Sequence, residues 1–211
     1  MFLITSQSYR IVFNLFIVPS YYIIYKPFQV LSQFTSTDEK LSLKDFFKVA
    51  SDVYPVGRLD YDSEGLLILT NDQQLNHRLL NPAFAHEREY WVQVDGDIDQ
   101  EAVDQLQSGV SINIDGKIYR TKPCKAKKII PPDGLPERNP PVRIRKNIPT
   151  SWISLVLQEG KNRQVRKMTA KVGFPTLRLI RYRIADITIE SLLPGDMRMI
   201  DKETIYRKLF G

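Results

Sequence analysis

Short apolar or alternating stretches, separated by turn residues, dominate the hydrophobic pattern of the chain. Residues 21–25 are aromatic and β-branched and stop at Lys26-Pro27, which predicts a strand followed by a turn. Residues 66–70 form an uninterrupted apolar run that is too short for a helix and fits a buried strand. The same reasoning predicts strands at 89–94, 111–114, 117–120 and 152–157, and strand-like sequence over 176–200 that is broken at Pro194-Gly195.

Helical spacing of apolar residues, bounded by capping or breaking residues, occurs in four places. The first helix begins after Asn71 or Asp72 and cannot continue past Pro82. The other three are predicted over 99–108, which Gly109 ends, over 161–172, which Gly173 ends, and after Asp201, which caps the last helix.

Strands outnumber helices in this pattern, and several connections look like hairpins. Asp115-Gly116, between two predicted strands, is a residue pair preferred in two-residue type I′ turns. Neighbouring strands are therefore expected to be antiparallel, and the predicted class is α+β rather than a regular βαβ fold. We expect one main domain over residues 21–211, with residues 1–20 as a loosely held tail or an extra strand.

The charge balance favours a polyanionic partner without identifying it. The chain has 30 Lys and Arg against 24 Asp and Glu, a net charge of +6 and an isoelectric point near 9.3. Seven of the 13 prolines lie within residues 122–150, interleaved with lysines and arginines. This segment is either a solvated loop or a basic arm that lies along RNA.

Few residues could hold a metal ion or form a disulfide. Cys124 is the single cysteine, and the two histidines are His77 and His86. We therefore expect no internal disulfide, no metal site, and a reducing cytoplasm as the compartment. The apolar run at 11–18 is interrupted by Asn14 and is shorter than the ~20 residues of a membrane-spanning helix, so we expect no membrane segment.

The densest group of chemically reactive side chains lies in residues 57–65, where Asp60, Asp62 and Glu64 alternate between two glycines. An EF-hand calcium loop is excluded, because its twelfth position would be Asn71, where a bidentate glutamate is required. Carboxylate pairs suit glycoside hydrolysis. However, such a motif usually sits in an eight-fold barrel of about 250 residues with repeated strand–helix units, which this chain lacks. An acidic turn before a strand is the remaining alternative.

Four segments in one order resemble the bacterial ribosomal RNA pseudouridine synthases of the RsuA type, from about residue 22 to residue 200. Gly57-Arg58-Leu59-Asp60, with Ser63-x-Gly65-Leu66-Leu67-x-Leu69-Thr70-Asn71-Asp72 after it, is similar to the catalytic motif of that family. The other three segments are Tyr25-Lys26-Pro27, Arg88-Glu89-Tyr90-Trp91-Val92 and Glu159-Gly160-Lys161-Asn162-Arg163-Gln164-Val165-Arg166-Lys167-Met168.

The resemblance implies that Asp60 is the indispensable catalytic group. The reaction detaches uracil from its ribose and reattaches it through carbon five, and it needs no cofactor or metal. An ionised carboxylate either attacks the sugar or stabilises the positive charge that develops as the glycosidic bond opens. Asp62 and Glu64 are expected to serve the architecture of the loop rather than catalysis.

Further roles follow from the resemblance alone. Arg166 matches the basic residue that pairs with the catalytic aspartate, and Tyr90 matches the active-site tyrosine that stacks on uracil and helps move a proton. Arg58 is a candidate for filling the gap that the flipped base leaves, and Val165 for an apolar wall of the uracil pocket. The residues expected to contact RNA phosphates are Lys161, Arg163 and Lys167.

Many members of the family begin with an RNA-binding domain of the S4 type, which we do not expect here because the first motif starts near Tyr21. Recognition of RNA then falls on the core and on residues 122–150. The implied fold is a mixed, largely antiparallel sheet with flanking helices and a central RNA-binding cleft. The implied partner is ribosomal RNA, with the large subunit expected first and the protein a monomer. Small-subunit or other RNA, and a catalytically inactive RNA-binding homologue, are the alternatives.

Overall fold

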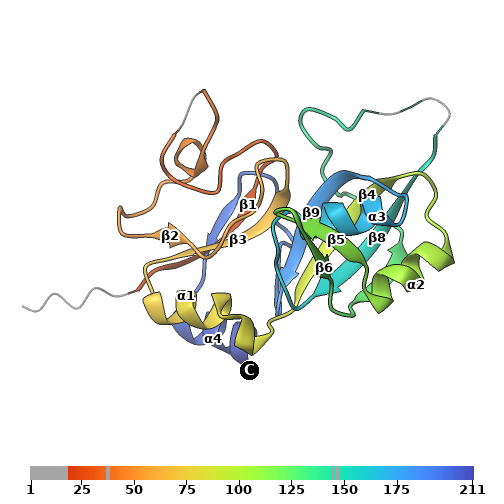
Figure 1. The fold of residues 1–211 in the computed structure, drawn as a ribbon. Coiled ribbons are helices and arrows are strands. Elements are labelled where there is room, and N and C mark those ends of the chain that lie inside the picture. Colours follow the sequence, from red (N-terminus) through yellow and green to blue (C-terminus); the bar gives the residue numbers. More distant parts are fainter. Residues whose placement is uncertain (1–18, 37–38, 144, 146–147) are drawn as a thin grey trace, which may run out of the picture.

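The computed structural model describes residues 19–36, 39–143, 145 and 148–211. Two lobes lie side by side in Figure 1. The expectation of a tail or extra strand concerns residues 1–20, and residues 1–18 lie outside the described part of the chain. Every strand predicted from the sequence is present, within small shifts of its ends. Strands β2 (Tyr54–Pro55) and β7 (Lys125–Ile129) were not predicted.

One mixed sheet has nine strands. Besides β2 and β7 they are β1 (Tyr21–Lys26), β3 (Glu64–Thr70), β4 (Arg88–Asp95), β8 (Thr150–Leu157), β9 (Thr176–Ile184), β10 (Ile187–Thr188) and β11 (Met197–Met199).

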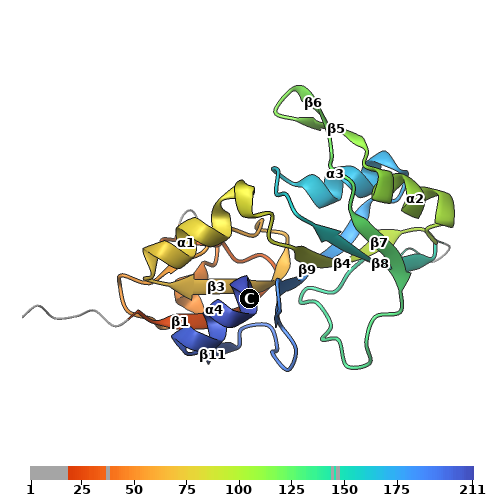
Figure 2. The same ribbon diagram turned by 90° about the horizontal axis from the view of Figure 1, so that it is seen from below.

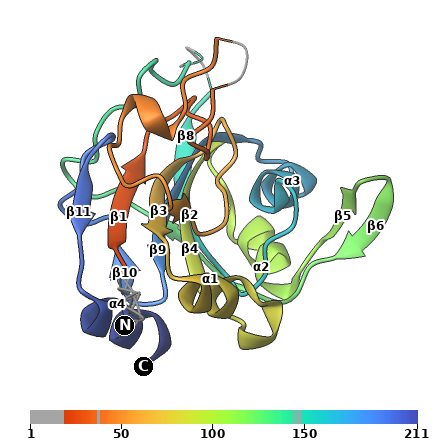
Figure 3. The same ribbon diagram turned by 90° about the vertical axis from the view of Figure 1, so that its left-hand side faces the viewer.

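The order across the sheet is β11-β1-β3-β9-β4-β8-β7, with β2 on β3 and β10 on β9. Every neighbouring pair is antiparallel except β3 and β9, which run parallel. A separate hairpin of β5 (Ser111–Ile114) and β6 (Lys117–Arg120) projects from the body in Figure 3. Its turn residues Asp115 and Gly116 have φ of 50° and 83°, as the predicted type I′ turn requires. The α+β class with a largely antiparallel sheet is confirmed.

Four α-helices accompany the strands in the described residues, and each was predicted. Asp72, Asp99 and Asp201 accept hydrogen bonds from backbone N–H groups of the first turn and so cap three of them. The helices are α1 (Gln73–Leu80), α2 (Gln100–Ser108), α3 (Gln164–Lys171) and α4 (Lys202–Phe210).

The expected start of the third helix was wrong. Helix α3 begins at Gln164, because Arg163 has a left-handed backbone (φ 53°) that cannot continue an α-helix. Lys161 and Arg163 therefore lie in the turn before α3 and not on the helix itself, where they were expected. The turn points the side chain of Arg163 in a direction that the helical pattern does not predict.

Each lobe has its own apolar core. In one lobe, α2 and α3 pack on β4 and β8, and Val92, Leu106, Leu155 and Met168 are buried between them. The other lobe packs α1 and α4 on β1 and β3, around Leu66 among others. Figure 2 shows β9 between the two groups. The two lobes therefore meet along β9.

Both interpretations of the basic segment 122–150 treated it as irregular chain, but part of it is a strand. Strand β7 pairs with β8, and two of its lysines form ion pairs, Lys125 with Glu87 and Lys128 with Asp97. Arg138 donates a hydrogen bond to the carbonyl of Leu177. Lys146, also part of the predicted arm, lies outside the described residues. The described part of the segment is thus anchored to the sheet at several points.

A close approach of β3 and β9 fixes the place where the lobes meet. The pairing between these strands is short, Glu64 with Ile180 and Gly65 with Arg181. A Cβ atom added to Gly65 would lie 2.4 Å from the carbonyl oxygen of Arg181, so glycine is required there. Beside it, the buried carboxylate of Glu64 accepts two hydrogen bonds of 2.9 Å from Arg178. The loop that carries Asp60 enters β3 at this junction.

Candidate active site

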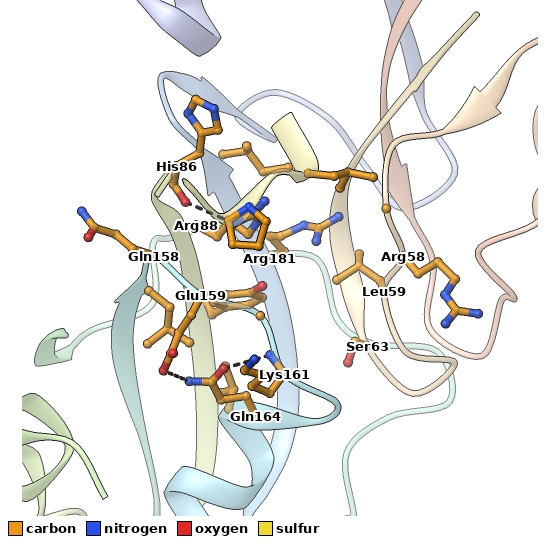
Figure 4. Close-up of a pocket in the computed structure, with 18 of the residues that line it drawn as sticks. Arg58, Leu59, Ser63, His86, Arg88, Gln158, Glu159, Lys161, Gln164 and Arg181 are labelled. Atoms are coloured by element: carbon orange, nitrogen blue, oxygen red, sulfur yellow. Dashed lines mark hydrogen bonds between the residues drawn. The ribbon is translucent and has the colours of Figure 1, made fainter. Parts of the chain in front are cut away.

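A cavity of about 570 Å³ lies where the two lobes meet (Figure 4). Six of the eight residues that the sequence suggested for the site line it, and Arg166 and Lys167 do not. Arg58 and Asp60 come from the loop before β3, and Tyr90 comes from strand β4. Lys161 and Arg163 come from the turn before α3, and Val165 lies in the first turn of that helix.

The backbone around Asp60 is held by local hydrogen bonds. The buried Oγ of Ser32 donates to the carbonyl of Leu59 at 2.8 Å and accepts from the N–H of Leu59 at 3.0 Å. The N–H of Ser63 donates to the carbonyl of Asp60 at 3.1 Å and closes the turn. These bonds tie the residues on both sides of Asp60, and its half-exposed carboxylate faces the cavity.

Two arginines of the α3 region meet the loop at Asp62. Arg163 donates two hydrogen bonds to the carboxylate of Asp62, of 2.7 and 2.8 Å, in a forked geometry that is strong for this pair of groups. Arg166 places Nε 3.4 Å from the same carboxylate and donates to the carbonyl of Asp62. The hydrogen bond from Arg163 holds the pKa of Asp62 below its usual range, although burial opposes the shift.

The expected pairing of Arg166 with Asp60 is therefore not the contact that the structure contains. Nη1 of Arg163 lies 3.8 Å from the carboxylate of Asp60, while Arg166 contacts Asp62 instead. Arg163 was expected only to contact phosphate. The arginine nearest to Asp60 could not be chosen from the sequence, because both arginines are about a hundred residues away from the loop in the chain.

An aromatic and apolar wall faces the Asp60 loop. Tyr90 comes from β4, where it is paired with Arg181 of β9. Val165 and Leu179 are both buried and line the same cavity. A flat ring of low charge, such as a nucleobase, fits a wall of this kind.

Sequence reasoning missed Arg181. Its side chain is 5% exposed, and its Nε donates to the carbonyl of Leu66 at 2.8 Å. Its Nη2 is buried and has no hydrogen-bond partner among the described residues. Burial lowers the pKa of Arg181, and Tyr90 opposes that shift more than Asp60 does. Strand β9 carries three arginines, Arg178, Arg181 and Arg183, and no sequence pattern singled out Arg181 among them. Its burial is the signal that the structure adds, because buried charges are usually paired or functional.

The remaining predicted residues lie at the edges of the cavity. The exposed side chain of Arg58 points away from the other labelled residues in Figure 4. The ammonium of Lys161 lies 5.1 Å from the ring centroid of Tyr119 in the β5–β6 hairpin. Lys167 lies on α3 outside the cavity lining. These positions allow contacts with a ligand that extends beyond the cavity.

No group of three or more His, Cys, Asp or Glu side chains in the described residues is placed to hold a metal ion. No helix in that part of the chain has the length and apolar character to cross a membrane.

The arrangement suits chemistry at a sugar that carries a flat base. A carboxylate that lines a cavity with one apolar wall, together with a buried guanidinium in the same lining, can attack a carbon or stabilise a cation that develops there. The apolar wall and Tyr90 would hold the base while this happens.

Several proteins with similar sequences are named as pseudouridine synthases, enzymes that act on a base and its sugar. The ribosomal large subunit pseudouridine synthase E of Vibrio parahaemolyticus is 49% identical over 175 residues, which are 83% of this chain and 71% of the relative. The protein of the same name from Xanthomonas campestris pv. campestris is 46% identical over 182 residues, 85% of this chain and 95% of the relative. The ribosomal large subunit pseudouridine synthase B of Bacillus subtilis is 33% identical and covers 90% of this chain and 71% of its own length.

The fold is shared with a solved pseudouridylate synthase. That structure has a TM-score of 0.72 and 27% sequence identity, and it covers 91% of this chain and 74% of its own. The model of the RNA pseudouridylate synthase family matches residues 20–171, which include Asp60, Tyr90 and the start of α3. The resemblance drawn from the four motifs is thereby confirmed. Because fold, motifs and cavity agree with this match, the chain belongs to the RNA pseudouridylate synthase family.

Proposed function

We propose that the protein converts one uridine of large-subunit ribosomal RNA to pseudouridine, with Asp60 as the essential carboxylate. The observation that carries this proposal is the position of Asp60, on a fixed loop at the mouth of a cavity with an apolar wall. The names of the relatives from Vibrio and Xanthomonas support the choice of the large subunit.

The reaction is an isomerisation in which no atom is gained or lost by the RNA. The bond between C1′ of the ribose and N1 of uracil breaks, the uracil turns within the cavity, and a bond forms between C1′ and C5. The proton on C5 leaves and N1 takes one up. Asp60 acts on C1′, as a nucleophile or as a negative charge beside the developing cation.

Three side chains assist Asp60 in this proposal. Tyr90 stacks on the uracil and lies close enough to the reacting ring to move its proton. Val165 packs against the opposite side of the base. Arg181 supplies a fixed, buried positive charge at the cavity, and its Nη2, which has no hydrogen-bond partner among the described residues, is available to the substrate.

The target base must leave its stack to reach the cavity. Arg58 is exposed at the rim and carries a flat guanidinium, which suits it to fill the gap in the RNA. Because its side chain points away from the cavity in the free protein, this role requires Arg58 to turn when RNA binds.

RNA phosphates would be held by the basic residues that surround the cleft. Lys161 and Lys167 lie near its α3 end. Within the segment 122–150, Lys127 and Arg143 are exposed, whereas Lys125, Lys128 and Arg145 are already paired with acidic residues. Exposed cations that form no ion pair in the described part of the chain are the better candidates for phosphate contacts, since counterion release drives such binding. We propose that the protein does this work as a monomer in the cytoplasm.

One specific observation favours a second RNA target. A relative from Escherichia coli, 33% identical over 181 residues, is named a dual-specificity RNA pseudouridine synthase. The chain spans about half of the length of that relative, 54%. The same active site could therefore accept a uridine in another RNA.

The substrate is tested by incubating the purified protein with three RNAs that carry tritium at C5 of uridine. Large-subunit ribosomal RNA, small-subunit ribosomal RNA and transfer RNA serve as the arms, and release of tritium to water measures turnover. We expect stoichiometric release from one site of the large-subunit RNA. Release of tritium from another RNA alone would identify that RNA as the substrate instead. No release from any RNA or from ribosomal particles would favour an inactive RNA-binding protein.

A further inference from the structure

The cavity extends beyond the residues that act on the target uridine. Asp60, Tyr90 and Arg181 line it, and Figure 4 shows Arg181 between Lys161 and Gln164 on one side and His86 on the other. The end near His86 has no part in the proposed reaction. Its wall is the turn that follows α1, which contributes Leu80, Asn81, Pro82, Ala85 and His86 and is called the 80–86 wall below.

The 80–86 wall presents apolar and aromatic groups to solvent. Leu80 is 43% exposed. Phe84 is in the same turn and is 50% exposed; it lies outside the cavity lining, beside His86. The ring of Phe84 is stacked on His86, with centroids 6.0 Å apart and an angle of 28° between the planes. Burial lowers the pKa of His86, so its ring is uncharged at neutral pH. Exposed apolar surface beside a cleft is typical of a contact site.

Hydrogen bonds hold the wall in this shape before any ligand arrives. Arg88 donates to the carbonyls of Leu79 and His86, at 3.0 and 3.2 Å. The side chain of Asn81 accepts from the N–H of Ala83 at 3.0 Å and caps the short turn. A preformed wall loses little conformational entropy on binding.

The wall is also continuous with the loop that carries Asp60. A Cβ atom added to Gly57 would lie 3.0 Å from Cδ2 of Leu80, so the loop passes directly against this side chain. Arg58 follows at the rim of the same cavity. A nucleotide next to the target in the RNA strand would therefore meet Leu80 and Arg58 together.

The charge around the wall selects among possible occupants. Residues 78–86 contain no Asp or Glu, and the carboxylate of Glu87 is turned toward Lys125 and Arg183. Apolar surface with cations and no carboxylate matches a nucleobase whose phosphate passes a guanidinium. Such a surface does not favour a cationic ligand, because it offers no carboxylate to pair with the positive charge.

We propose that the 80–86 wall is a second subsite, which takes the unpaired base adjacent to the target uridine in the same RNA strand. The proposal rests on the proposed function, because it assumes that RNA fills the central part of the cavity. The subsite gives the enzyme a second contact with the single-stranded region and so contributes to the choice of one uridine among many.

The test combines protein variants with altered RNA. The substrate is a fragment of large-subunit ribosomal RNA that contains the uridine modified by the wild-type protein, prepared intact or with an abasic residue at its 5′ or its 3′ neighbour. The variants are Leu80→Ala and Phe84→Ala, both at exposed positions, and the control is Leu193→Ala, which is 58% exposed and outside the cavity lining. Thermal melting verifies that each variant folds.

We expect Leu80→Ala and Phe84→Ala to raise KM for intact RNA about tenfold, the size of one lost stacking contact, while kcat stays near the wild-type value. One of the two abasic RNAs should show the same loss with the wild-type protein and no further loss with Leu80→Ala. The subsite proposal would be overturned if the loss from Leu80→Ala and the loss from the abasic RNA multiplied when combined. It would also be overturned if both variants behaved like Leu193→Ala on every RNA. A loss seen with ribosomal particles but not with naked RNA would also overturn it, in favour of a protein occupant. Failure of the proposed function is distinguishable, because the wild type would then modify no intact ribosomal RNA fragment.

Discussion

At the scale of single residues, Asp60 and Asp62 share one loop but have different surroundings. Asp62 is held by a forked pair of hydrogen bonds from Arg163 and by a contact with Arg166. Asp60 has a single cation within 4 Å in the described residues, at 3.8 Å. We infer that Asp62 fixes the arginines and the loop, which leaves the carboxylate of Asp60 free to meet the ribose.

Replacing Asp62 by Asn should therefore lower turnover about ten- to a hundredfold, because the loop loses its link to the α3 region. RNA affinity should stay the same or rise, since the change frees Arg163 and removes a negative charge. Single-turnover rates and filter binding measure the two effects. Asp115→Asn in the hairpin turn is the matched control. Equal turnover of the two variants would contradict the role of Asp62.

The pKa of Asp62 also sets the pH range of this link. The hydrogen bond from Arg163 lowers the pKa in the folded protein below the ordinary value of 3.8. The stabilisation is therefore present above that ordinary value and is lost only as the pH falls through the lowered pKa. At the neutral pH of a turnover assay the carboxylate is ionised and the link is intact.

Lys26 gives a pH dependence of the opposite kind. Its side chain is fully buried, and Nζ donates to the carbonyls of Pro27 and Val30. Burial lowers its pKa from 10.5 to about 7, against the charge of Glu64. Between these pH values the unfolded chain holds the proton and the folded protein does not. The contribution of Lys26 therefore makes the free energy of unfolding rise with pH in this window.

Urea unfolding at pH 7, 8 and 9 tests this sign. We expect the wild type to gain up to about 1.4 kcal/mol per pH unit relative to Lys26→Met, which has no proton to lose. Parallel stability curves for the two proteins over this range would mean that Lys26 stays charged inside the fold.

At the scale of elements, the junction of β3 and β9 decides where the catalytic loop begins. Gly65 lets the two backbones approach, and the ion pair of Glu64 and Arg178 lies buried beside it. A register shift in the pairing of β4 with β9 lies between Glu89 and Tyr90, so that Arg181 lies opposite this tyrosine. Two irregularities of the sheet thus bring Asp60, Tyr90 and Arg181 to one cavity.

Gly65→Ala should lower the free energy of unfolding by about 2–4 kcal/mol, because its methyl group would overlap the backbone of Arg181. Gly116→Ala is the control, since Gly116 also has a positive φ but has no atom within 4 Å of the added Cβ. We expect it to cost about 1 kcal/mol from backbone strain alone. Urea denaturation measures both, and equal losses would show that the close approach does not matter.

The sequence predicted most elements but not their arrangement. Strand and helix ends follow from local patterns, as with Asp72 before α1 and Gly109 after α2. The parallel pairing of β3 with β9 depends on packing between distant segments, so no local pattern reveals it. Strand β7 was hidden by the prolines and lysines around it, because an edge strand needs few apolar residues.

The position of the site could be predicted from the sequence, but not the contacts within it. The motif around Asp60 singled out the loop that we propose to be catalytic, because four segments in order are specific. It could not say which arginine meets which aspartate, since that depends on the left-handed backbone of Arg163. Arg181 was missed because the pattern of β9 shows an ordinary strand, and its place opposite Tyr90 depends on the pairing of β4 with β9.

At the scale of the whole molecule, two lobes joined along β9 present one cleft and a net charge of +6. Some of the cations form ion pairs within the protein, such as Lys125 with Glu87 and Arg145 with Asp95. The exposed Lys127 and Arg143 keep theirs available for RNA.

The dependence of RNA affinity on salt tests this division. Replacing Lys127 and Arg143 by Gln should reduce the slope of log affinity against log salt by about 0.7 for each phosphate contact that is lost. Lys202→Gln on α4, which lies on the far lobe, is the control and should leave the slope unchanged. An unchanged slope in the double variant would favour the solvated-loop interpretation of residues 122–150.

The central claim is that Asp60 of this protein makes one pseudouridine in large-subunit ribosomal RNA. The most direct measurement is carbodiimide-stop mapping of pseudouridine in the RNA of both ribosomal subunits, from cells with the gene intact, deleted, or restored as wild type or Asp60→Asn. We predict one site in the large-subunit RNA that disappears on deletion, returns with the wild type and does not return with Asp60→Asn, whose turnover should fall at least about 10³-fold. Restoration of the site by Asp60→Asn, or an unchanged map after deletion, would contradict the account.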